Sequence, residues 1–216
     1  MKYARHGHSC CQVGNRYILV SGSRKEVSGA ANRVELFDTE INDWMELSKI
    51  NEADIIIQAA ISMIDSSLFL VESKIKTRNT PLLSKGYKIS NQFSQPWEKI
   101  NLAAQSVGQS ITARQGAGMT QLSPNEIVIV GGFNGKFLSD YYLLQFNDQG
   151  AAVSVTKQEN ERSMIQGATL FPFQVPTIGD IKNRQAYTVD WQNMSLFFYN
   201  GQKWTYNKHV KHQANF

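Results

Sequence analysis

A glycine-rich segment that ends in a lysine looks most like a chemical site in this sequence. In "EIVIVGGFNG", residues 126–135, an apolar run leads into three glycines, and Lys136 follows. A phosphate-binding loop of the Walker A type needs the pattern G-x-x-x-x-G-K-[ST]. Here Val130 stands where its first glycine is needed and Phe137 where its hydroxyl is needed. The alternating segment 140–147 then predicts a strand, whereas a dinucleotide site needs a helix. We therefore expect no nucleotide at this loop.

Two histidines and two cysteines near the N-terminus form a second cluster with ligand chemistry. On a strand, His6, His8 and Cys10 would share one face. A structural zinc site usually has four ligands, and no acidic residue stands close by in sequence. We predict no metal site and no cofactor. Cys10 and Cys11 are neighbours and would point to opposite faces, so no disulfide framework is expected, which fits a reducing, cytoplasmic environment.

The composition and the scattered charges narrow the class of protein. The chain has 216 residues, 42% of them apolar, and a net charge of +4. Its basic residues are dispersed, so we do not expect nucleic-acid binding. No apolar run approaches the about 20 residues of a membrane helix, and no signal-peptide core is present. There is no G-x-S-x-G nucleophile elbow, and the acidic residues are also dispersed. We therefore do not expect an enzyme.

A repeat appears when distant segments are compared. Four segments share a short apolar run closed by a small or polar pair, and they start at residues 17, 67, 126 and 184. A strand candidate precedes each of these segments, and in the fourth unit it covers residues 164–171. A strand of alternating apolar and polar residues follows each segment. A last short strand completes each unit and places a tryptophan similarly in three of them, Trp44, Trp97 and Trp204. Units of four antiparallel strands at roughly 50-residue spacing indicate propeller blades.

The first and third units resemble the kelch family. "RHGHS", "YILVSGS" and "NRVELFDTEINDW" match the family's pattern in the first unit, and "ARQGAG", "EIVIVGG" and "SDYYLLQFN" match it in the third. The resemblance implies an all-β kelch-type β-propeller over residues 1–216. It would have about four blades of four antiparallel strands, at approximately 4–50, 51–110, 111–160 and 161–210. Kelch rings more often have six or seven blades, so we favour an open arc or half-ring, with a small closed ring as the alternative.

The resemblance also implies where a partner would bind. In peptide-binding kelch proteins, arginines before the inner strands line the central pocket; at the matching positions stand Arg5, Arg114 and Arg162. The loops between second and third strands would add contacts, and in the third unit these residues are Phe133, Asn134 and Lys136. A basic pocket would recognise an acidic peptide through arginine–carboxylate pairs. Alternatively, each arginine pairs with the backbone or a carboxylate of a neighbouring blade.

We therefore expect a non-catalytic protein-interaction module that binds a protein or an acidic peptide. Self-association through exposed end blades is a further possibility, because an arc leaves apolar faces uncovered at both ends. Kelch-like propellers also include copper radical oxidases and a sugar epimerase, so a catalytic propeller is the alternative. A truncated propeller without function is a third reading.

Overall fold

The structure, a computed structural model, is all-β in the part of the chain that it describes. It describes residues 1–5, 8–23, 30, 32–50, 57–64, 67–72, 82–83, 85–90, 93, 95–101, 111–112, 114, 117–132, 134, 136, 138–147, 152–159, 177–180, 182–190 and 195–207. Within these residues, no helix is long and apolar enough to cross a membrane.

The described residues form four antiparallel four-stranded sheets, each with its strands in chain order, and one short strand pair. The first sheet contains β1 (Ser9–Val13), β2 (Tyr17–Ser21), β3 (Val34–Asp38) and β4 (Asp43–Glu46). The second contains β5 (Ile57–Ile64), β6 (Ser67–Glu72), β8 (Lys85–Ser90) and β9 (Glu98–Asn101). The third contains β11 (Gly118–Ser123), β12 (Glu126–Val130), β13 (Asp140–Phe146) and β14 (Ala152–Glu159). The fourth contains β15 (Thr177–Asp180), β16 (Gln185–Asp190), β17 (Ser195–Tyr199) and β18 (Trp204–Asn207). A short pair joins β7 (Leu82–Leu83) to β10 (Ile111–Thr112).

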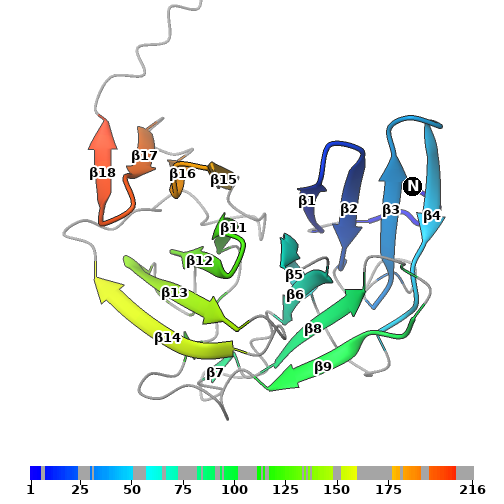
Figure 1. Cartoon of the computed structure of the whole chain (residues 1–216), viewed down its shortest axis with the longest axis horizontal. Helices are drawn as coiled ribbons and strands as arrows, with labels where there is room; N and C mark the ends of the chain where they lie inside the picture. The colour runs from blue at the N-terminus through cyan, green and yellow to red at the C-terminus, as the bar shows by residue number, and fades with distance from the viewer. Residues whose placement is uncertain are drawn as a thin grey trace, which may run out of the picture.

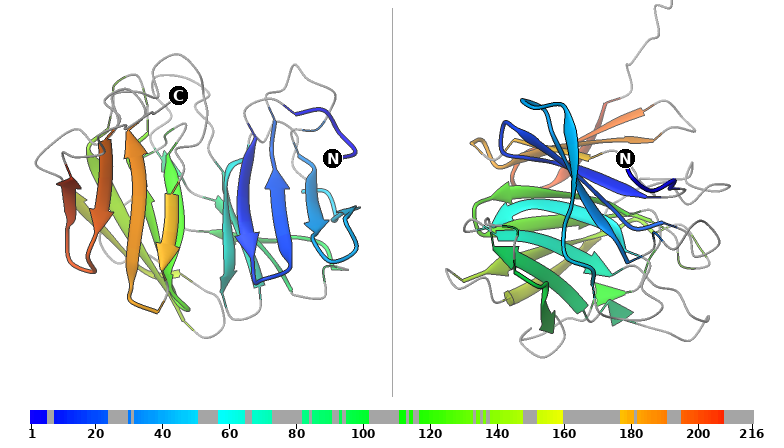
Figure 2. Two further views of the ribbon diagram at one scale, coloured as in Figure 1. Left: turned by 90° about the horizontal axis from the view of Figure 1, so that it is seen from above. Right: turned by 90° about the vertical axis from the view of Figure 1, so that its right-hand side faces the viewer.

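The four sheets follow one another around an arc (Figure 1). Their first strands line its inner side, where β1 lies beside β5, β5 beside β11, and β11 beside β15. The first and fourth sheets form the two ends of the arc, and both ends lie at the top of the view in Figure 1. The second strands β2 and β16 run toward the same edge of the molecule (Figure 2).

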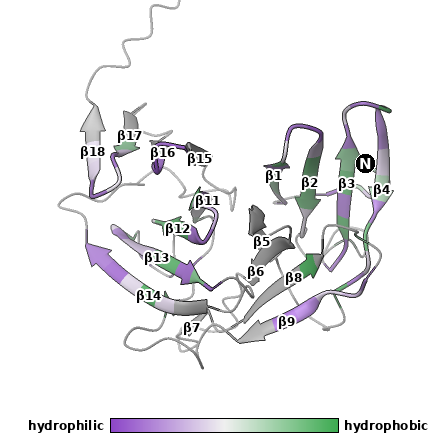
Figure 3. Cartoon of the chain, viewed as in Figure 1, coloured by the Kyte–Doolittle hydropathy of each residue, from purple (hydrophilic) through white to green (hydrophobic). Residues whose placement is uncertain are grey.

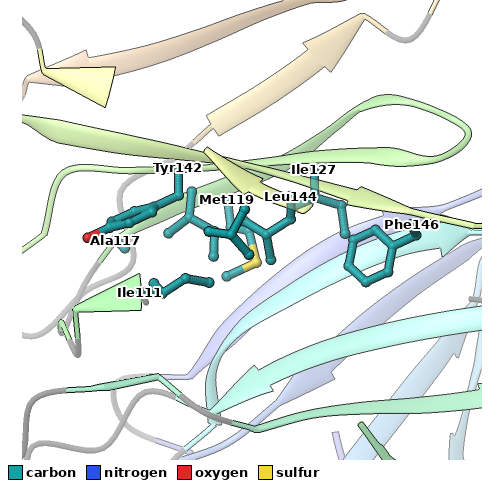
Figure 4. Close-up of a cluster of buried hydrophobic side chains, with 9 residues drawn as sticks. Ile111, Ala117, Met119, Ile127, Tyr142, Leu144 and Phe146 are labelled. Carbon is teal, nitrogen blue, oxygen red and sulfur yellow. The ribbon is translucent and has the colours of Figure 1, made fainter. Parts of the chain in front are cut away.

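The third sheet explains why the sheets stack face to face. All five residues of β12 are buried, although side chains of a strand alternate between two faces. Ile127 and Ile129 join one apolar cluster, whereas Val128 and Val130 join another on the opposite face. Figure 4 shows the first cluster, and Figure 3 shows that β12 is largely hydrophobic. Such a strand is stable only when both faces are covered, as they are between two neighbouring sheets.

The boundary between the first and second sheets has its own apolar cluster. Its buried members are Val13, Leu19, Val34, Leu36, Leu47, Ile50 and Ile89. Trp97, which stands just before β9, packs against this cluster and donates its Nε1–H to the carbonyl oxygen of Ser48 at 2.7 Å. This contact ties the outer strand of the second sheet to the chain segment that leaves the first.

Two details of the fourth unit differ from the sequence expectation. Its first strand is Thr177–Asp180, which pairs with β16, whereas residues 164–171, where we expected it, lie outside the described residues. The segment 177–180 is separated from β16 by only a short turn, and short connections favour hairpin pairing. The second strand begins at Gln185, so the alignment that began at Arg184 is wrong by one residue. On a strand, that shift exchanges the two faces.

Candidate functional site

Arg5, the first predicted pocket residue, is buried inside the first sheet. Its guanidinium pairs with Glu35 of β3, with Nε to Oε2 at 2.9 Å, and both side chains are fully buried. The same group donates to the carbonyl oxygen of Gly22, 2.8 Å away, and to those of Ala30 and Arg33. Arg5 therefore clamps both ends of the connection between β2 and β3.

Arg114 makes the same arrangement in the third sheet. Its Nη1 lies 2.8 Å from Asp140 Oδ1 at the start of β13 and 2.8 Å from the carbonyl oxygen of Gly131. Its side chain is fully buried, and that of Asp140 is 8% exposed. Burial pushes the pKa of Asp140 upward, but the hydrogen bonds and charge of Arg114, helped by Lys157, outweigh it and hold that pKa below its usual value. The carboxylate therefore stays ionised beside its arginine.

The two arginines occupy equivalent places, because each precedes its clamped glycine by seventeen residues. Both are engaged within their own sheets and have no side-chain surface open to a partner. The arginines thus pair with backbone and carboxylate groups, as in the alternative, but these groups belong to the same sheet, so the expected neighbouring blade is wrong. We therefore leave Arg5 and Arg114 out of the binding surface. Arg162 lies outside the described residues.

The clamp in the third sheet holds the predicted binding loop between β12 and β13. Gly131 and Gly132 have φ angles of 61° and 98°, values that favour glycine because side chains clash there. Backbone hydrogen bonds from Gly131 N to Asp140 O and from Leu138 N to Gly132 O, both 3.0 Å, close the stem of the loop. The glycine pair thus makes a turn at the end of a strand.

Lys136 and Asn134 stand at the tip of this loop. Asn134 is half-buried and donates its backbone N–H to the carbonyl oxygen of Lys136 at 3.2 Å. Lys136 is exposed. Phe133, the third predicted residue of the loop, lies outside the described residues. Of the predicted site residues that the structure describes, the loop brings together only Asn134 and Lys136.

The histidines and cysteines near the N-terminus differ in how far they are buried. His8 is half-buried, and burial together with the positive charge of Arg5 lowers its pKa. Cys10 is exposed, whereas burial raises the pKa of the Cys11 thiol. His6 lies outside the described residues. Among the residues that the structure describes, no three His, Cys, Asp or Glu side chains gather closely enough to hold a metal ion.

Sequence reasoning missed the acidic partners of these arginines and one ion pair between sheets. Arg184 pairs with Glu126 of the third sheet and donates to the carbonyl oxygen of Gly201 in the fourth. Arg16, which precedes β2 as Arg184 precedes β16, instead pairs with Asp38 of its own sheet. The equal spacing of Arg5 from Gly22 and of Arg114 from Gly131 could have revealed the clamp, but the acidic partners follow loops of unequal length.

Comparisons with known proteins agree with the observed architecture. No protein-family model and no curated protein matches the sequence. Among solved structures, a fungal alcohol oxidase of the AA5 family, in complex with copper, is similar over 96% of this chain, with a TM-score of 0.54 and 12% identity. The fold is that of a kelch-like β-propeller. This propeller chain spans 44% of the length of that oxidase. At this level of identity, the two proteins share the fold, and the copper and the activity are properties of the oxidase.

Proposed function

We propose that this propeller is a non-catalytic protein-interaction module of the kelch type that binds an acidic peptide segment of a partner protein. The binding surface would be the propeller edge where the second strands end. The observation that carries the proposal is the charge of the connections between second and third strands. In the first three units their basic residues include Arg24, Lys25, Lys74, Lys76, Arg78 and Lys136, and the acidic residue is Glu26.

The described part of this edge supports a preorganised surface. Lys136 is exposed at the tip of a loop whose stem is closed by backbone hydrogen bonds and by Arg114. A loop already held in one conformation loses less entropy on binding than a free one. Arg5 clamps the corresponding connection in the first sheet in the same way. Arg5 and Arg114 therefore hold the ends of two of the basic connections in place.

The test uses fluorescence anisotropy with a labelled peptide rich in aspartate and glutamate and containing one aromatic residue. A peptide in which lysine and arginine replace the acidic residues is the specificity control. We expect the acidic peptide to bind more tightly and its affinity to fall as salt rises, because exposed charges are screened. Lys136→Glu should weaken binding several-fold. Lys203→Glu, which reverses an exposed lysine between β17 and β18 at the opposite edge, should leave it unchanged.

Two results would overturn the proposal. One is equal affinity for the acidic and the basic peptide. The other is an equal loss of affinity in Lys136→Glu and Lys203→Glu, because the attraction would then come from net charge and not from the loop edge.

A further inference from the structure

The third and fourth sheets carry an equivalent row of three side chains, one on each of the second, third and fourth strands, and this row faces the preceding sheet. In the third sheet the row consists of the cross-strand partners Ile127, Leu144 and Val155, and in the fourth of Ala186, Tyr199 and Trp204. All six side chains are buried, with at most 7% of each residue exposed. In these two sheets the row is therefore covered by a neighbour.

The same row in the first sheet is uncovered. It consists of Ile18, Phe37 and Trp44, which are cross-strand partners on β2, β3 and β4. Ile18 is 39% exposed, whereas Ile127 at the equivalent place is fully buried. Phe37 and Trp44 are half-buried and stack with ring centroids 5.0 Å apart. The first sheet thus carries an apolar row of the kind that a preceding sheet covers, at the end of the arc where Figure 1 draws no further sheet of the described residues.

The fourth sheet also has an uncovered apolar face, which is its outer face. In the third sheet, Val128 faces the following sheet and is fully buried. Tyr187, at the equivalent place of the fourth sheet, is 37% exposed. Its partner Phe198 is half-buried, and their ring centroids lie 4.9 Å apart. The uncovered face of the fourth sheet is therefore equivalent to the face of the third sheet that packs against the following sheet.

We propose that the two free faces cover each other in a dimer, in which the fourth sheet of each copy packs on the first sheet of the other. Where the first sheet meets the second, and where the third meets the fourth, a face of the type free on the fourth sheet meets a face of the type free on the first. A second copy offers both types. Because both ends of the arc lie on one side of the molecule (Figure 1), two arcs related by a two-fold axis can satisfy all four end faces and close the assembly.

The charges beside the two faces are complementary. Glu40 in the turn between β3 and β4 and Asp43 at the start of β4 are both exposed. The turns that border the outer face of the fourth sheet present Lys182 and Lys203, which are also exposed. All four residues stand at the edge where the ion pair between Arg184 and Glu126 crosses from the fourth sheet to the third. Opposite charges at this edge favour contact between unlike ends over contact between like ends.

Arg16 supports the same pairing. It immediately precedes β2, as Arg184 immediately precedes β16, but among the residues that the structure describes no sheet lies before the first one for it to contact. Its guanidinium folds back onto Asp38 and Glu40, with 40% of the side chain exposed. In the dimer it would face Gln185 of the other copy, which holds the place that Glu126 holds in the third sheet.

The first measurement is molar mass by light scattering during size-exclusion chromatography of the 216-residue chain, over a dilution series. We expect a species of twice the 24.4 kDa chain mass that dissociates on dilution. Ile18→Lys and Tyr187→Glu should each give monomers, because either change affects both contacts of the symmetric dimer. Thr156→Lys is the matched control, since it adds a charge to an exposed position on the outer strand of the third sheet, and it should leave the mass unchanged.

Mixing the two defective variants distinguishes this dimer from other dimers. A pair of one Ile18→Lys chain and one Tyr187→Glu chain has one unaltered contact and one contact with opposite new charges, so dimers should return. Restored dimers also show that the single variants are folded. Gln185→Glu should shift the dissociation midpoint to lower concentration, because it offers Arg16 the carboxylate that Glu126 offers Arg184.

Three results would overturn the proposal. The first is a wild-type chain that stays monomeric throughout the dilution series. The second is disruption by only one of the two end variants, which would indicate contact between like ends. The third is growth beyond two copies, which would show that the arcs do not close. Peptide binding at the loop edge is independent of these outcomes, so this proposal and the proposed function can fail separately.

Discussion

Arg184 in the turn before β16 forms a two-pronged ion pair with Glu126 at the start of β12, and so joins the fourth sheet to the third. Arg184 Nε lies 2.6 Å from Oε2 of Glu126, and Nη2 lies 2.7 Å from Oε1. The Glu126 side chain is 6% exposed and the Arg184 side chain 42% exposed. A bidentate pair fixes direction as well as distance, so it sets how the fourth sheet sits on the third.

The first prediction concerns the coupling between these two residues. A double-mutant cycle with Glu126→Gln and Arg184→Met, followed by urea unfolding, should give a coupling energy of about 1 kcal/mol, reduced by the partial exposure of the arginine. The pair of Lys157 and Glu159 on β14, in which the carboxylate is 64% exposed, is the comparison and should give a smaller coupling. Equal coupling in both pairs would contradict a special role for Glu126 in joining the sheets.

The second prediction concerns the buried pair of Arg114 and Asp140. Arg114→Met should lower the free energy of unfolding by about 3 kcal/mol, the lower end of the range for a broken buried pair, because the buried carboxylate keeps only the more distant Lys157 as a charged partner. Adding Asp140→Leu should recover part of that loss, since the poorly compensated charge is then removed. Recovery remains partial because Arg114 also binds the carbonyl oxygens of Thr112 and Gly131. A double variant less stable than Arg114→Met would contradict this account.

The third prediction is the pH dependence of stability that Asp140 confers. Its pKa is lowered in the folded chain, so the unfolded chain takes up the proton first as the pH falls. The stabilisation is therefore complete above the unfolded pKa of about 3.9 and is lost as the pH falls through the lower folded value. Asp140→Asn should be less stable than the wild type at pH 7, and the difference should shrink at acidic pH. Urea unfolding of both proteins at a series of pH values measures this, and a constant difference would contradict it.

The fourth prediction concerns the adjacent cysteines, which should differ in reactivity although they are neighbours. Cys10 is exposed on the outer face of β1, whereas Cys11 packs against the cluster between the first and second sheets, and burial raises its pKa. The thiolate is the reactive form, so a maleimide should label the folded chain, diluted until it is monomeric, at Cys10 alone. Cys10→Ser should abolish labelling of the folded chain and leave one site after unfolding. Rapid labelling of folded Cys10→Ser would place Cys11 on the surface.

The sequence predicted the sheets because their strands repeat simple patterns. The alternating run 140–147 and the apolar run at 126–130 correspond to β13 and β12 within a residue. The first strand of the fourth unit was misplaced because "TIGD" is short and weakly apolar, and its pairing depends on the turn that follows. Arg184 was aligned with Glu126, the residue that it binds, because the apolar pattern of that unit is too weak to fix the register.

The candidate site was less accessible to sequence reasoning than the fold. Arg5 and Arg114 have the residue type and position of ligand-binding arginines, and the sequence does not show that Glu35 and Asp140 meet them. Those partners come from the third strand of each sheet, after connections of different lengths, so only the folded chain brings them together. Lys136 kept its predicted place because an exposed loop tip depends little on distant residues.

The most direct test of the proposed function is hydrogen–deuterium exchange of the chain with and without the acidic peptide. We expect slower exchange in the loop between β12 and β13, around Lys136, and none of this protection in Lys136→Glu. The turns at the opposite edge, which contain Lys182 and Lys203, should exchange at the same rate with and without peptide. Protection confined to those turns, with the loop around Lys136 unaffected, would contradict the proposed function.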